Sequence, residues 1–85
     1  MPSISMFFGI IIYMYADEHN PPHFHAKYQD FNAVFDLDGE LIEGKMPRNQ
    51  LKLISAWAYM HKDELEANWT LAQNRQPLYR IDPLR

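Results

Sequence analysis

The chain has 85 residues and no cysteine, so we expect one small domain over residues 1–85 without disulfide bonds or thiolate zinc sites. Apolar residues make up 47% of the sequence and aromatic residues 14%, which is too much for a disordered protein. The net charge of −3 argues against broad, nonspecific binding to a nucleic-acid backbone, because that mode needs a cationic surface.

The first predicted element is a buried β-strand over residues 4–15, which are apolar on both alternating faces. Gly9 inside this stretch suggests a bulge or a close backbone approach. The stretch lacks the cationic start and the cleavage site of a secretory signal, and it is shorter than the roughly 20 residues that span a membrane. We therefore expect a cytoplasmic protein that does not bind membranes. Pro21 and Pro22 must end the strand.

Two segments that alternate with period two follow, residues 23–28 and 31–37, and Gln29 and Asp30 can form the turn between them. Asp38 and Gly39 favour a type I′ turn into a further strand over residues 40–45. Two-residue turns would fix the register of this meander. The predicted pairs are Tyr28 with Phe31, His25 with Val34, His23 with Asp36, Asp36 with Leu41, and Val34 with Glu43. The predicted apolar face comprises Phe24, Ala26, Tyr28, Ala33, Phe35 and Ile42. The predicted polar face comprises His23, His25, Lys27, Asn32, Asp36, Glu43 and Lys45.

From Pro47 to about residue 74, apolar residues recur every three or four positions, which indicates amphipathic helix. One helix of that length would measure about 40 Å, which is long for a domain whose radius of gyration should be about 12 Å. We therefore expect a break near His61 and Lys62, with Asp63 and Glu64 in the first turn of the second helix. The tail, residues 75–85, should lie extended along the surface.

Together these elements predict an α+β fold. A small antiparallel β-meander sheet of about four strands, residues 3–45, is packed on one face by two C-terminal helices, residues 47–74. The apolar face of the meander and the apolar stripe of the helices cannot be buried separately, so each is expected to cover the other.

Residues 19–25 read HNPPHFH and contain three of the four histidines, with Asp17 and Glu18 directly upstream. His23 and His25 are two apart on a predicted strand, so their side chains leave the same face about 6.6 Å apart at Cα. That spacing allows both imidazoles to bind one metal ion. Asp36, opposite His23, would complete a set of two histidines and one carboxylate for a divalent transition metal such as zinc or ferrous iron.

His19 is harder to include in such a site. If residues 20–22 form a trans polyproline II segment, His19 and His23 are separated by about 12 Å. A turn at Pro21 and Pro22, with or without a cis bond, would bring the two rings together.

Two other interpretations of the motif stay open. His23 and His25 could act without a metal, one as general base and one as general acid in RNA cleavage, with Lys27 stabilising the phosphorane. Asp36 and Glu43 count against this, because they would repel a phosphate. The histidines could also decorate an ordinary polar sheet face.

The remaining candidates are weaker. Lys45 and Arg48 form a small basic spot beside a predicted helix N-terminus, where anions bind readily, although a solvated edge is the preferred explanation. His61 lies in the helical stripe and is expected to be a core or helix-end histidine.

The motif HNPPHFH, together with the segments AVFDLDGELIEGKMP, WAYMHKDELEANW and QPLYRI, resembles the bacterial domain-of-unknown-function family 4160 over essentially the whole chain. The matching motif residues are His19, Asn20, Pro21, Pro22, His23, Phe24 and His25, with Glu43, Gly44 and Lys45 as a second, weaker block. Some members are described as DhiT-type toxins of type II toxin–antitoxin modules, often encoded beside a small protein of domain-of-unknown-function family 2442. The resemblance implies a cytosolic bacterial protein with a small antitoxin-like partner, and no established reaction.

We therefore expect the toxin-like component of a toxin–antitoxin pair, in which His19, His23 and His25 act on RNA, with Lys27 as a further catalytic candidate. One alternative is a non-catalytic interaction module that binds a partner protein at an exposed sheet edge by strand addition. Another is a metal-binding or sensing domain without catalysis. A homo-oligomer is compatible with each of these.

Overall fold

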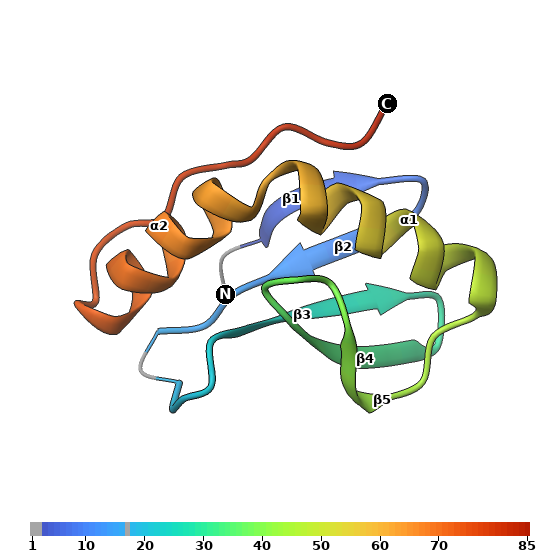
Figure 1. The fold of residues 1–85 in the computed structure, drawn as a ribbon, viewed down its shortest axis with the longest axis horizontal. Helices are drawn as coiled ribbons and strands as arrows, with labels where there is room; N and C mark the ends of the chain where they lie inside the picture. The colour runs from blue at the N-terminus through green and yellow to red at the C-terminus, as the bar shows by residue number, and fades with distance from the viewer. Residues whose placement is uncertain (1–2, 17) are drawn as a thin grey trace.

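The computed structural model describes residues 3–16 and 18–85. The elements are β1 Ser3–Phe7, β2 Ile10–Tyr13, β3 His23–Tyr28, β4 Phe31–Asp36, β5 Leu41–Gly44, α1 Arg48–Met60 and α2 Lys62–Gln73. The strands form one antiparallel sheet in the order β1-β2-β3-β4-β5, and the helices lie on one side of it (Figure 1). This is the predicted α+β fold with one strand more than expected.

The additional strand comes from the apolar segment near the N-terminus. The prediction of one strand over residues 4–15 is wrong, because β1 and β2 form a hairpin in which Phe7 pairs with Ile10. Phe8 and Gly9 make the turn, with φ values of 48° and 78°, as a type I′ turn requires. Gly9 therefore marks a turn and not a bulge.

The pairing of β3 with β4 follows the predicted register. The pairs include Tyr28 with Phe31, His25 with Val34, and His23 with Asp36. The alternation of β3 also holds, because Phe24 and Ala26 are buried while Lys27 is exposed. The two-residue turn at Gln29 and Asp30 was therefore correctly predicted.

The pairing of β4 with β5 agrees with the prediction only in part. Val34 faces Glu43 as expected, but the register then shifts so that Leu41 faces Phe35 and not Asp36. The shift lies between Val34 and Phe35, where Ile42 is an extra, unpaired residue on β5. Ile42 is consequently 49% exposed, so its predicted place on the apolar face is wrong.

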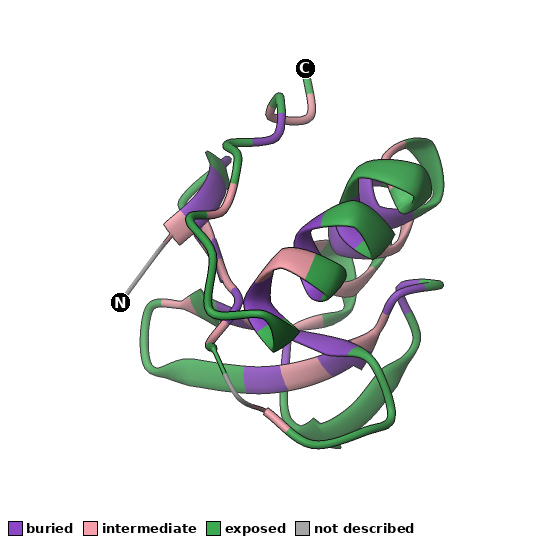
Figure 2. Cartoon of the chain, turned by 90° about the vertical axis from the view of Figure 1, so that its left-hand side faces the viewer, coloured by how far each residue is buried: buried purple, intermediate pink, exposed green. Residues whose placement is uncertain are grey.

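The two helices break at the predicted position. His61 lies between α1 and α2, and Asp63 and Glu64 occupy the first turn of α2. The core lies where the helices meet the sheet (Figure 2). The ring of Trp57 on α1 is fully buried there, with its centroid 5.3 Å from that of Phe7 and 5.8 Å from that of Phe24. The radius of gyration is 11.6 Å, in line with the expected compactness.

The C-terminal tail is extended, as predicted, but it contributes to the core. Ile81 is buried, and its backbone N–H donates to the carbonyl of Ile4 on β1 at 2.8 Å. The indole N–H of Trp57 donates to the carbonyl of Asp82 at 2.8 Å. The side chain of Asn68 on α2 bonds both the N–H and the carbonyl of Tyr79. These contacts fasten the tail to the edge strand and to both helices.

No helix within the described residues has the length and apolar character needed to cross a membrane.

Candidate metal centre

The motif HNPPHFH ends in the first three residues of β3, and strand alternation separates their side chains. Phe24 points into the core, where its ring stacks on that of Phe35 with centroids 5.5 Å apart. His23 and His25 leave the same side of the strand, and their ring centroids are 5.2 Å apart. The structure therefore brings together the two imidazoles that the H-x-H spacing predicts.

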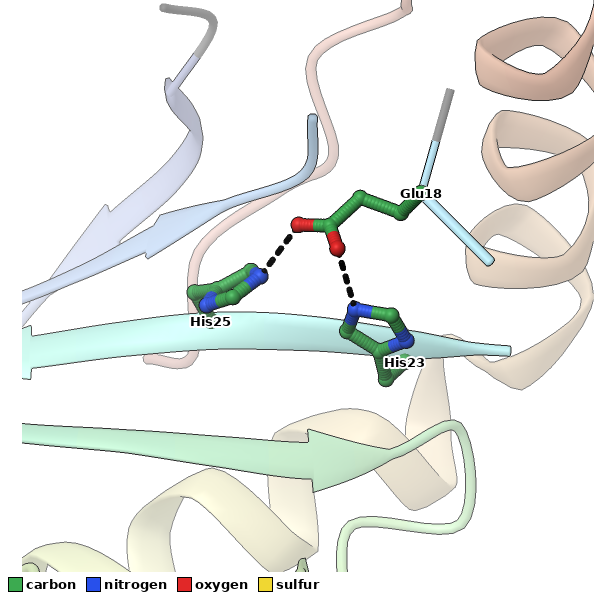
Figure 3. A group of neighbouring side chains, drawn as sticks. All are labelled: Glu18, His23 and His25. Carbon is green, nitrogen blue, oxygen red and sulfur yellow. Dashed lines mark hydrogen bonds and ion pairs between the residues drawn. The ribbon is translucent and has the colours of Figure 1, made fainter. Parts of the chain in front are cut away.

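The carboxylate that joins these imidazoles belongs to Glu18, in the loop before β3. Its Oε1 lies 2.7 Å from Nε2 of His25, and its Oε2 lies 3.1 Å from Nε2 of His23 (Figure 3). The ligand atoms of Glu18, His23 and His25 all lie within 4.8 Å of one another. Two imidazole nitrogens and one carboxylate oxygen form a familiar ligand set for zinc or ferrous iron. Small side-chain movements would bring all three onto one ion.

Asp36 does not belong to this ligand group, although it faces His23 across the strands as predicted. Its Oδ1 accepts hydrogen bonds from the backbone N–H groups of Asp38 and Glu40, at 2.9 Å and 3.0 Å. The loop after β4 thus uses this carboxylate to satisfy its own backbone. Within the described residues, the carboxylate grouped with the two histidines is that of Glu18 and not that of Asp36. Asp17 lies outside the described residues.

A hydrogen bond from the motif's own backbone fixes the orientation of His23. Its Nδ1 lies 2.7 Å from the carbonyl oxygen of Pro21, and a carbonyl can only accept, so Nδ1 carries a proton. Nε2 is left to face Glu18, either as a second donor or with its lone pair towards a metal. Histidine metal ligands are commonly held in this way, with the second ring nitrogen donating to a carbonyl.

The environment of Glu18 keeps its carboxylate ionised. Partial burial raises its pKa, but the hydrogen bonds from His25 and His23 and the charges of these two residues lower the pKa by more. The pKa of Glu18 therefore lies below its ordinary value. An ionised carboxylate is the form that binds a metal ion.

Helix α2 and the segment after β2 support the site from two directions. The Gln73 side chain donates to the backbone carbonyl of Glu18 at 2.7 Å, and the Trp69 ring lies 5.2 Å from that of His23. Tyr15 meets His25 edge to face at 4.7 Å. The side chain of His23 is only 9% exposed, whereas that of His25 is 27% exposed. One candidate ligand is thus shielded, and the other opens to solvent.

His19 borders the site but is not part of the ligand group. Its side chain is exposed, and its ring centroid lies 6.4 Å from that of His23. The Asn20–Pro21 peptide bond is cis. Asn20 and Pro22 are both exposed.

The other predicted site residues lie outside the ligand group. Lys27 is exposed, two positions beyond His25 on β3. Lys45 and Arg48 are exposed near the start of α1. His61 occupies the helix junction, where its Nδ1 lies 2.6 Å from Oε1 of Glu64, so its predicted helix-end position is confirmed.

Two pockets on the sheet surface adjoin the histidines. The larger, about 270 Å³, is lined by Glu18, His19, Pro21, His23, Val34, Ile42 and Glu43. The smaller, about 160 Å³, includes His25, Tyr13, Tyr15, Asn32, Val34 and Glu43 in its lining. Val34 and Glu43 border both pockets, so the candidate metal centre lies beside a continuous hollowed surface.

Comparison with protein families found a match to the model described as Domain of unknown function (DUF4160), over residues 9–70. This range contains β2 to β5, α1, most of α2 and all three residues of the ligand group. Comparisons with curated proteins and with solved structures found no significant match.

Proposed function

The chain belongs to the DUF4160 family, and on that premise we propose that it is the toxin-like component of a toxin–antitoxin pair. In this proposal it acts on RNA in the bacterial cytoplasm through a divalent transition metal held by Glu18, His23 and His25. The observation that carries the proposal is the convergence of two Nε2 atoms and one ionised carboxylate within 4.8 Å. A small antitoxin-like protein is the proposed partner.

The geometry favours metal-assisted chemistry over acid–base catalysis by the histidines alone. A general acid and a general base must reach different oxygens of the reacting phosphate. Here the Nε2 atoms of His23 and His25 both point at one carboxylate. Glu18 fills the space between them, and its negative charge would repel the phosphate. A divalent metal ion would reverse the sign of the local charge and attract the phosphate.

Three protein ligands would leave coordination positions open for water and a phosphate oxygen. A metal held there would activate bound water and polarise the phosphoryl group. His23 would hold the ion in a shielded position, since its ring is fixed by the Pro21 carbonyl. Lys27 follows His25 on the same strand face and can stabilise charge that develops on the phosphate. His19, at the border of the larger pocket, is a candidate proton donor to the leaving oxygen.

Induced expression in bacteria tests this function. We expect the wild-type protein to arrest growth, and coexpression of its genomic neighbour to relieve the arrest. The His23→Ala, His25→Ala double variant and Glu18→Gln should be harmless, whereas His61→Ala should remain toxic. A folded double variant that arrests growth as strongly as the wild type would exclude the site from this function.

Purified protein provides the second half of the test. We expect RNA cleavage to stop when a chelator removes the metal and to resume when zinc, manganese or ferrous iron is added. RNA cleavage that persists after complete metal removal would contradict the metal-assisted mechanism and would revive acid–base catalysis by the histidines.

A second candidate function is supported by the open edge of the sheet. β5 is an edge strand, every residue in it is exposed, and Leu41 and Ile42 are 43% and 49% exposed. Such an edge can accept a strand from a partner protein. If this non-catalytic function is correct, Ile42→Lys should abolish partner binding, while the histidine double variant should bind the partner normally in a pull-down.

A further inference from the structure

The smaller pocket beside the candidate metal centre has an aromatic wall. Its lining includes Tyr13 and Tyr15, whose rings are nearly parallel, at 15°, with centroids 6.3 Å apart. Tyr15 in turn contacts the ring of His25 at 4.7 Å. The aromatic surface therefore continues directly into a metal ligand. The proposed metal chemistry gives no role to Tyr13 or Tyr15.

Strand register places polar groups around this wall. Tyr13, His25, Val34 and Glu43 follow one another across β2, β3, β4 and β5 as successive paired residues. Lys27 pairs with Asn32 two residues further along, about 6.6 Å from this row. The sheet surface thus carries an aromatic wall, a metal ligand, a carboxylate, an amide and a cation at fixed spacings.

We propose that the smaller pocket receives an unpaired base of single-stranded RNA, next to the phosphate at which cleavage would occur. This inference rests on the proposed function. Aromatic side chains stack on exposed bases of any identity. Bases in a duplex are already stacked and paired, so only a single strand can offer one to the pocket. His25 and Lys27 lie beside the pocket. There, the metal held by His25 and the positive charge of Lys27 would meet the phosphate next to the bound base.

Glu43 gives the pocket a preference among bases. A carboxylate only accepts hydrogen bonds, so it favours a base edge that carries an amino group. Cytosine offers its N4 amino group to such an acceptor, whereas uracil has a carbonyl oxygen at the same position. Cytosine and uracil have almost the same size and shape. The comparison between them therefore isolates the contribution of Glu43.

Fluorescence anisotropy with labelled oligocytidylate measures this binding on the zinc-loaded protein. We expect oligocytidylate to bind more tightly than oligouridylate, than an abasic ribose oligomer, and than the same strand annealed to its complement. Tyr13→Leu should weaken oligocytidylate binding about tenfold through loss of stacking, and Tyr13→Phe should retain it. Glu43→Gln should reduce the preference for cytosine over uracil. Tyr59, 82% exposed on α1, provides the control variant Tyr59→Leu, which should bind like the wild type.

Cleavage of the same oligomers separates failure of this inference from failure of the proposed function. If no RNA is cleaved but Tyr13→Leu still weakens binding selectively to single strands, the proposed reaction fails and the base pocket stands. If RNA is cleaved but Tyr13→Leu binds and cleaves oligocytidylate as well as the wild type, the base pocket is overturned. Equal affinity for duplex, abasic and single-stranded oligomers would also overturn it.

Discussion

At the scale of single residues, Glu18 is the centre of the candidate site. Each oxygen of its carboxylate contacts one histidine nitrogen, and its backbone carbonyl accepts a hydrogen bond from Gln73. A metal ion would replace the protons that His23 and His25 donate to this carboxylate. The three groups are already oriented towards one another, which lowers the entropic cost of binding an ion.

Part of this site could be predicted from the sequence. Strand alternation is a local property, so the spacing of His23 and His25 was enough to predict their convergence. The identity of the carboxylate was not predictable in that way. The path of the loop that carries Glu18 depends on contacts with α2, 55 residues later in the chain. The hydrogen bonds that Asp36 accepts from its own loop depend on the shape of the connection between β4 and β5, which has four residues where two were expected.

The different roles of Asp36 and Glu18 lead to a prediction. Asp36→Ala removes two hydrogen bonds in the loop after β4, so it should lower the free energy of unfolding by about 1–2 kcal/mol. It should leave the affinity for zinc unchanged, whereas Glu18→Gln should weaken zinc binding strongly. Urea denaturation and zinc titration of both variants measure these effects. If folded Asp36→Ala lost most of its zinc binding, Asp36 would be a metal ligand, as the sequence pattern suggested.

Gly44 allows a second prediction at this scale. Its φ is +89°, and a Cβ atom there would collide with the backbone of Asn32. The left-handed conformation alone costs about 1–2 kcal/mol for a residue with a side chain. Gly44→Ala should therefore lower the free energy of unfolding by more than this amount, and by more than Gly9→Ala, where the added atom would meet only the Tyr28 ring at 3.4 Å. Equal losses in chemical denaturation would show that the contact with Asn32 is unimportant.

At the scale of elements, the sequence predicted most strands and both helices, and the failures have identifiable causes. The β1–β2 hairpin was missed because both faces of residues 4–15 are apolar, so no alternation marked its turn. Phe8 adopts a positive φ that is uncommon for a bulky residue, so Gly9 was the only residue that indicated a turn. The tail was expected on the surface because it has little periodicity. Its role depends on partners far away in the sequence, such as Ile4 and Trp57.

The tail provides a prediction about packing. Ile81→Ala removes a buried side chain between β1 and the helices, and substitutions of this kind cost about 2–5 kcal/mol. Tyr79→Ala is the control, because its side chain is 73% exposed and its bonds to Asn68 involve only backbone atoms. It should change the free energy of unfolding by less than about 0.5 kcal/mol. Similar losses for the two variants in thermal denaturation would mean that the tail is not part of the core.

At the scale of the whole molecule, both helices cover one face of the sheet (Figure 2). The two pockets beside the candidate metal centre are lined by residues of the other face, such as Val34 and Glu43. The net charge of −3 does not attract RNA by itself. A divalent ion between Glu18 and the histidines would supply local positive charge on this face, with Lys27 beside it. RNA binding should therefore depend on the bound metal more than on the overall charge of the protein.

Metal binding should also stabilise the whole domain. An ion that binds only the folded state adds about 2.7 kcal/mol to the free energy of unfolding when its free concentration is 100 times its Kd. We expect zinc to raise the Tm of the wild-type protein by several degrees and to leave the Tm of the His23→Ala, His25→Ala variant unchanged. Scanning calorimetry measures both. An equal increase in the two proteins would place the zinc site elsewhere.

The most direct test of the central claim is calorimetric titration of the metal-free protein with zinc. We predict one equivalent of zinc bound per chain, strong loss of binding in Glu18→Gln and in the His23→Ala, His25→Ala variant, and normal binding in His61→Ala. Absence of zinc binding by the folded wild type, or equal binding by the double variant, would contradict a metal site at Glu18, His23 and His25.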